Sequence, residues 1–110
     1  MKKLYAALLT ISLWCGATWH AYAIDTTNTR LLWQPAISRQ HIAFIYAEDL
    51  WVANRDGSNP RRLSVDAGTE SNPVFSPDGQ SIAFSAQYDG NTDVFVVPTT
   101  GGVPRRLTWH

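Results

Sequence analysis

The sequence predicts an all-β protein: two four-stranded antiparallel blades of an incomplete β-propeller, preceded by a signal peptide. Three observations support this fold class. A unit of roughly 40 residues occurs twice, its short apolar runs are separated by turns rich in Pro, Asp, Asn and Gly, and its middle strands are apolar on both faces. A sheet with two apolar faces needs a cover on each side, which stacked blades supply.

Residues 1–23 are interpreted as a secretory signal peptide that is removed before Ile24. Lys2 and Lys3 give it a positive start, the run from 4 to 13 is almost wholly apolar, and alanines occupy positions 21 and 23. The apolar run is too short to favour a membrane-spanning helix, and an uncleaved anchor stays open as the weaker alternative.

Cys15 suggests a lipoprotein, but Trp14 stands just before it, where lipid attachment requires a small residue. We therefore expect a periplasmic or secreted protein without a stable membrane anchor after cleavage. Cleavage removes the only cysteine, so the fold cannot depend on disulfides. The remaining chain carries seven arginines against nine acidic residues, a balance that does not favour binding to nucleic acid or anionic lipid.

The repeat is clearest in the second half of each unit. The tetrapeptide DLWV at 49–52 corresponds to DVFV at 93–96, and PRRLS at 60–64 corresponds to PRRLT at 104–108, both 44 positions apart. In the first halves, the tripeptide IAF recurs 40 positions after Ile42. The spacing differs because insertions fall in turns, which a repeated structural unit tolerates.

This register divides the chain into four segments. They are the signal peptide at 1–23, a short linker at 24–30, blade one at 31–64, and blade two at 65–110, which stops where a third blade should begin. The predicted strands cover 31–37, 41–46, 49–54 and 61–63 in blade one, and 72–76, 81–85, 93–97 and 104–108 in blade two.

The tripeptide Pro77-Asp78-Gly79 predicts a hairpin turn within blade two. Proline fixes its own φ, aspartate bonds the nearby backbone, and glycine takes positive φ freely. The strands on either side belong to sheets that need further sheets stacked against them. Since propellers close with about four to eight blades, we expect the chain to be a piece of a longer protein.

The segments NPVFSPDGQSIAFSA, YDGNTDVFVVP and GGVPRRLTWH resemble TolB-type propeller repeats. Their combination is most similar to the amino-terminal β-propeller of tricorn proteases and their bacterial homologues, over residues 29–110. The resemblance implies a large exported serine-type peptidase. In this family the first propeller is followed by a second propeller, a PDZ domain and a catalytic domain, and it gates or channels peptides towards the catalytic chamber.

None of the family's catalytic positions has a counterpart in this chain, so we assign no catalytic, cofactor-binding or metal-binding residue and expect these residues themselves not to catalyse. The implied partners are peptide or protein substrates of the complete propeller and the remaining blades of the parent chain. Assembly of the parent into a homo-oligomer stays open.

Two alternatives to the peptidase remain. One is a TolB-type periplasmic propeller that binds proteins without enzymatic activity, although the short linker leaves no room for the small α/β domain that precedes TolB blades. The other is a propeller in front of an α/β-hydrolase peptidase or an amidohydrolase. The sequence that follows the last blade would distinguish them.

Several polar side chains invite a catalytic or metal-binding interpretation. Ser76, Ser81, Ser85 and His41 combine hydroxyls with an imidazole, but no serine lies in a G-x-S-x-G elbow, and local backbone bonding is the better interpretation. The segment 89–93 places three oxygen-bearing side chains at alternate positions, faintly like a calcium loop. Because it lacks the downstream bidentate acid, we favour a hairpin loop.

Three further groups are given structural roles. Asp49 and Asp93 are expected to accept backbone bonds at the start of the third strand of each unit. The aromatic residues are expected to pack blade against blade rather than bind a ligand, and the paired arginines to be solvated on the outer edge strand rather than bind anionic peptide termini. These residues are Trp33, Trp51, Phe75, Phe84 and Phe95, and Arg61, Arg62, Arg105 and Arg106.

Overall fold

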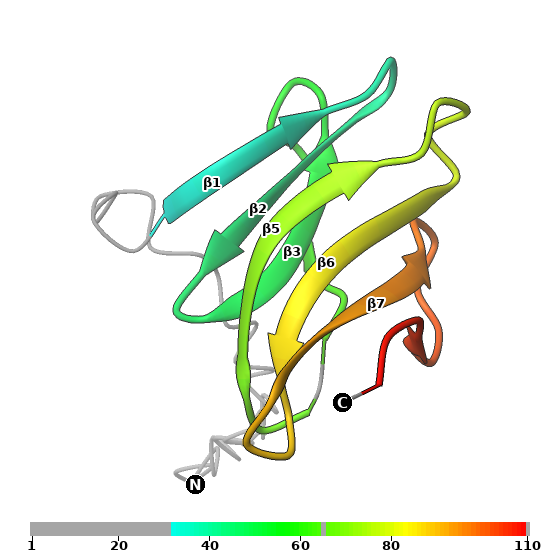
Figure 1. Ribbon diagram of the computed structural model, residues 1–110. Helices are drawn as coiled ribbons and strands as arrows, with labels where there is room; N and C mark the ends of the chain where they lie inside the picture. The colour runs from blue at the N-terminus through cyan, green and yellow to red at the C-terminus, as the bar shows by residue number, and fades with distance from the viewer. Residues whose placement is uncertain (1–31, 65, 110) are drawn as a thin grey trace, which may run out of the picture.

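A computed structural model describes residues 32–64 and 66–109. Two four-stranded antiparallel sheets pack face to face, each with its strands in chain order (Figure 1). The first sheet contains β1 (Leu32–Ile37), β2 (His41–Tyr46), β3 (Asp49–Asn54) and β4 (Arg61–Arg62). The second contains β5 (Thr69–Phe75), β6 (Ser81–Gln87), β7 (Thr92–Pro98) and β8 (Arg105–Arg106).

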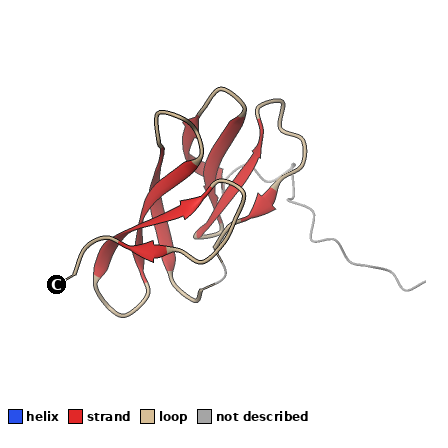
Figure 2. Cartoon of the chain, turned by 90° about the vertical axis from the view of Figure 1, so that its right-hand side faces the viewer, coloured by secondary structure: helices blue, strands red, loops and turns tan. Residues whose placement is uncertain are grey.

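The described residues consist of strands, turns and loops (Figure 2). The predicted fold class of two four-stranded antiparallel sheets is therefore confirmed, and β2 and β3 have the predicted bounds. In the part of the chain that the structure describes, no helix is long and apolar enough to cross a membrane. The predicted signal peptide and linker lie outside the described residues.

The largest corrections to the predicted strands concern β5, β6 and β8. β5 begins at Thr69, three residues before the predicted start at Asn72. Thr69 and the two residues after it pair with the last residues of β6, which also extends to Gln87, so each strand lengthens the other. β8 spans only two residues, although Leu107 N still donates to Val94 O at 2.7 Å just beyond its end.

The turn between β5 and β6 has the predicted chemistry. Gly79 adopts a φ of 72°, and its N–H donates to Ser76 O at 2.9 Å. Asp78 Oδ1 accepts from Gln80 N at 3.0 Å and from Ser76 Oγ at 2.5 Å. These bonds close the hairpin and fix the register in which β6 pairs with β5.

Both first strands contain a bulge at the same repeat position. The register of β1 shifts between Trp33 and Ala36, and that of β5 shifts between Ser71 and Val74. Gln34 and Asn72, inside these bulges, have φ values of 51° and 53°, and each precedes a proline that has no N–H for the ladder. The two sheets are therefore copies of one unit in their backbone irregularities as well as in sequence.

The apolar core lies between the two sheets. It is formed by alternate residues of the middle strands together with one residue after β4: Ala43, Ile45, Leu50, Val52 and Leu63 from the first sheet, and Ile82, Phe84, Ala86, Phe95 and Val97 from the second. The opposite faces are apolar as well but are only partly covered. Phe44 is half-buried there, and Val74 is 60% exposed.

Candidate functional site

Hydrogen bonds join the two sheets along both edges of their shared interface. Between the first strands, Gln34 Nε2 donates to Asn72 Oδ1 at 3.0 Å, and Asn72 N donates to Gln34 Oε1 at 2.7 Å. At the outer edge, Arg61 reaches across to the turn after β7, donating to Thr99 O at 2.6 Å and Thr100 O at 2.8 Å. The sheets are therefore held in one relative position from the inner strands to the outer strands.

A fully buried carboxylate, Glu70, lies in this interface, beside the turn between β2 and β3. One of its oxygens accepts from Leu50 N at 3.0 Å and from Ser64 Oγ at 2.5 Å, both in the first sheet. The other accepts from the Tyr88 hydroxyl at 2.8 Å, and the backbone N–H of Glu70 donates to Glu48 O at 2.9 Å. A buried carboxylate is tolerated because donors surround it.

The environment of Glu70 changes the protonation of two side chains. Burial raises the pKa of Glu70, while the bonds from Ser64, Tyr88 and the Leu50 N–H act in the opposite direction. Burial also raises the pKa of Tyr88, and the carboxylate that it faces raises it further. Tyr88 therefore remains protonated, and able to donate its hydroxyl hydrogen, at neutral pH.

Replacement of Glu70 by Gln is expected to remove one component of the pH dependence of folding. The folded chain binds a proton at Glu70 more tightly than the unfolded chain, whose pKa is near the ordinary value of 4.5. The stability that this proton provides is complete below that pH and is lost as pH rises through the raised folded pKa. Urea unfolding of the wild type and of Glu70→Gln, from about pH 4 to pH 7, measures this difference. Parallel pH profiles of the two chains would contradict the expectation.

A cleft of about 720 Å³ lies at the end of the interface where the β1–β2 and β5–β6 turns approach the residues after β7. His41, Arg61 and Asp78 are among its polar residues, and Ile37 and Phe75 are among its apolar residues. A cleft with both kinds of lining can accept an extended peptide segment, whose backbone is polar and whose side chains vary.

His41 and Ser76 both line this cleft, yet their contacts do not build a catalytic triad. The Ser76 hydroxyl donates directly to Asp78 at 2.5 Å and accepts from Ser81 N at 3.0 Å, so its bonds close the hairpin turn. Ser85 pairs with Ser71 in the middle of the second sheet. The structure therefore places His41 and one of the three serines in the same cleft, but that serine's hydrogen bonds are those of a hairpin turn and not those that activate a nucleophile.

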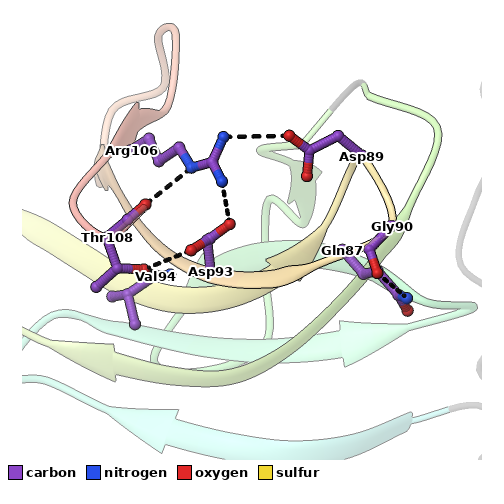
Figure 3. Close-up of polar contacts among 7 residues, drawn as sticks. All are labelled: Gln87, Asp89, Gly90, Asp93, Val94, Arg106 and Thr108. Carbon is purple, nitrogen blue, oxygen red and sulfur yellow. Dashed lines mark hydrogen bonds and ion pairs between the residues drawn. The ribbon is translucent and has the colours of Figure 1, made fainter. Parts of the chain in front are cut away.

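The loop at 89–93 is organised by Arg106 (Figure 3). Its guanidinium donates to Asp89 Oδ2 at 3.1 Å, to Asp93 Oδ2, and to Thr108 O at 2.8 Å. A cation is thus already placed between the two carboxylates, as a calcium ion would be in a loop built to hold one. Among the described residues no group of three metal-binding side chains occurs.

Two sequence-based expectations are corrected by these contacts. Asp49 accepts from Arg62 at 3.2 Å, as Asp93 accepts from Arg106, so these acids connect the third strand to the side chains of the fourth instead of fixing the strand start alone. The arginines, in turn, are not simply solvated edge residues. Arg61, Arg62 and Arg106 all form ion pairs or bonds to backbone carbonyls.

The aromatic side chains divide between the covered and the uncovered faces. Phe95 packs against Phe84 and Tyr88, with ring centroids 6.0 Å and 4.9 Å away, inside the interface between the sheets. Trp51, at the matching repeat position, lies on the outer face of the first sheet, 6.0 Å from Tyr46. Blade-to-blade packing therefore describes Phe95, whereas Trp33 is 47% exposed.

Glu70 was not identified as a candidate from the sequence, because it lies two residues before the predicted strand at 72–76, and a single glutamate in a turn is an ordinary solvent-exposed residue in most proteins. With its contacts known, the class of protein can be stated. Two copies of a four-stranded antiparallel unit, stacked face to face and linked first strand to first strand, define a β-propeller module.

The comparisons with known proteins identify the family. The tricorn protease N-terminal β-propeller domain family matches residues 29–110, so the chain belongs to this family. Tricorn protease homolog 1 of Streptomyces coelicolor is 39% identical over 67 residues, which are 61% of this chain and 6% of that protein. A TolB homolog of Chlorobium luteolum is 33% identical over 64 residues, which are 58% of this chain and 15% of that protein.

The fold agrees with a solved relative. The crystal structure of the tricorn protease matches with a TM-score of 0.63 and 27% identity, covering 71% of this chain and 8% of that one. The resemblance to tricorn propellers and to TolB repeats is therefore confirmed. The chain spans only a small fraction of the length of the tricorn relatives that it matches.

Proposed function

We propose that this chain forms two blades of the amino-terminal propeller of an exported tricorn-like serine peptidase, which gates or channels peptides towards a catalytic domain elsewhere in the parent protein. Membership of the tricorn N-terminal propeller family supports this proposal. In it, residues 1–23 direct export to the periplasm or the exterior, and the two blades contribute substrate passage rather than catalysis.

The observation that carries the channelling role is the amide pair on the first strands. The first strands of propeller blades surround the central channel. Gln34 and Asn72 lie there side by side, joined by two bonds, and Asn72 is exposed. Amide side chains offer donors and acceptors without net charge, so they can contact the backbone of peptides of varied sequence.

Replacing Asn72 with Asp in the full-length parent peptidase is expected to slow the cleavage of acidic peptides. Aspartate keeps the oxygen that accepts from Gln34 and tolerates the φ of 53°, so the fold should persist. The added negative charge repels acidic substrates in the channel. We expect kcat/KM for acidic peptides of about ten residues to fall roughly threefold to tenfold at low salt, with basic peptides unaffected or improved.

Asn59→Asp is the matched control. Asn59 is also exposed and has a φ of 51°, but it lies in the turn between β3 and β4 at the outer edge. It should leave the kinetics of both peptide classes unchanged. An equal response of the two variants would contradict the channelling role, and a full-length product without peptide hydrolysis would overturn the peptidase assignment itself.

The similarity to TolB proteins supports a second candidate, a periplasmic propeller that binds protein partners without catalysis. The same full-length product distinguishes the two candidates. A TolB-type protein would form a stable complex with a protein partner and hydrolyse no peptide, whereas a tricorn-like peptidase would turn over peptides.

A further inference from the structure

The carboxylate of Glu70 binds to a small group of hydrogen-bonded residues in the first sheet, here called the constellation. Leu50 N donates both to Ser64 Oγ, at 3.0 Å, and to Glu70 Oε2, at 3.0 Å. The Ser64 hydroxyl donates to the same carboxylate oxygen, and Leu63 N donates to Leu50 O at 2.8 Å beside it. The carboxylate thus meets two donors, one from the third strand and one from the residue after the fourth.

The second sheet repeats this constellation on its outward face. Val94 N donates to Thr108 Oγ1 at 2.9 Å, and Leu107 N donates to Val94 O at 2.7 Å. The same two hydrogen bonds occur around Leu50 and Ser64 in the first sheet. The difference lies in the direction of the hydroxyl. Thr108 Oγ1 donates to Asp93 Oδ1 at 2.8 Å within its own sheet, whereas Ser64 donates to an acid from the neighbouring sheet.

The apolar surroundings are repeated too. Leu63 is 6% exposed beneath the second sheet, whereas Leu107, its counterpart, is 40% exposed. Val74, which corresponds to the partly buried Ala36 of the core, is 60% exposed. The outward face therefore has the apolar and the polar parts of a sheet-binding surface, and its counterpart in the first sheet shows what such a surface binds.

We propose that the outward face of the second sheet docks a further four-stranded sheet of this repeat, which it recognises through a carboxylate on that sheet's first strand at the position of Glu70. The Thr108 hydroxyl turns from Asp93 to the incoming carboxylate, and Val94 N becomes its second donor. Arg106 remains paired with Asp93, and its positive charge offsets the repulsion between Asp93 and the incoming carboxylate. This proposal rests on the repeat and not on peptide channelling.

The chain itself offers a test, because its first sheet has no carboxylate at the position that corresponds to Glu70. The paired residues Leu32 and Tyr46 correspond to Glu70 and Ala86, so Leu32 occupies the position of Glu70 and faces away from the second sheet. Leu32→Glu would give the first sheet of one copy the carboxylate that the second sheet of another copy is built to receive. Leu32→Gln is the matched control with similar size and no charge.

The experiment uses the full 110-residue chain. Leu32→Glu or Leu32→Gln is immobilised through its carboxyl terminus, and the binding of soluble wild-type chain is measured at pH 7. A charge-assisted bond pair at a buried junction should make the glutamate variant bind at least about tenfold more tightly than the glutamine variant. Soluble Thr108→Val, which lacks the hydroxyl, should abolish this difference, and Thr108→Ser should preserve it because the first sheet uses Ser64 there.

Each result decides the proposal. Tighter binding by Leu32→Glu than by Leu32→Gln supports the proposal if the difference requires the hydroxyl at position 108. Equal binding by the glutamate and glutamine variants, including no binding by either, would overturn it, and so would an advantage that persists in Thr108→Val. None of these outcomes depends on peptidase activity, so failure here leaves the proposed function untouched.

Discussion

Phe84→Ala is expected to lower the free energy of unfolding of the chain by about 4 kcal/mol. Phe84 is 2% exposed and lies in the core between the sheets, stacked on Phe95. Removing the ring loses the transfer free energy of the buried atoms and leaves a cavity that two paired sheets cannot collapse to fill. Urea unfolding followed by tryptophan fluorescence, at submicromolar chain concentration to limit association, measures the change.

The repeat supplies a matched control, a phenylalanine at the same position of the other unit. Phe44 corresponds to Phe84 in the IAF tripeptide of the other unit, but it is half-buried on the outer face of the first sheet. Because Phe44 points away from the other sheet and is only half-buried, Phe44→Ala should lower the free energy of unfolding by only about 1 kcal/mol. Similar losses in the two variants would show that the core does not depend on the stacking of one sheet on the other.

The fold was predictable because its signals are local and occur twice. The apolar runs around Ile42 and Ile82 and the hairpin turn at 77–79 each specify their own conformation over a few residues. The repetition then shows that the same unit is built again, and the two apolar faces show that the units must stack. The structure confirms both the sheets and the stacking.

The bulges escaped prediction because their cause is not local. Pro35 and Pro73 are visible in the sequence, but the positive φ of the residue before each depends on how the first strand pairs with the second. Sequence patterns place a proline in a strand only as an edge residue. The pairing that turns it into a repeated bulge is a property of the folded sheet.

The interface chemistry was missed for a related reason. Leu50 and Glu70 are 20 positions apart and belong to different sheets, so their bond exists only once the sheets have stacked. Arg61 likewise finds its acceptors 38 and 39 positions away, in the turn after β7. A charged residue on a short edge strand looks solvated until the neighbouring unit is placed beside it.

Glu70→Ala is expected to lower the free energy of unfolding by about 2 to 4 kcal/mol. The substitution takes the acceptor from Leu50 N, the Ser64 hydroxyl and the Tyr88 hydroxyl at once. Leu50 N retains its bond to Ser64 Oγ at 3.0 Å, and the desolvation cost of the buried carboxylate disappears, so the loss should stay below the sum of three unsatisfied donors. The same urea titration at neutral pH provides the measurement.

Glu48→Ala is the appropriate comparison, because its exposed side chain is also a carboxylate and only its backbone carbonyl contacts Glu70. Its expected effect is within about 0.5 kcal/mol. If the acid joins the sheets, Glu70→Ala should also lower the protection of the Leu50 amide from hydrogen exchange more than that of amides in the middle of the second sheet. A uniform loss of protection, or a stability equal to that of Glu48→Ala, would mean that apolar packing alone holds the two blades together.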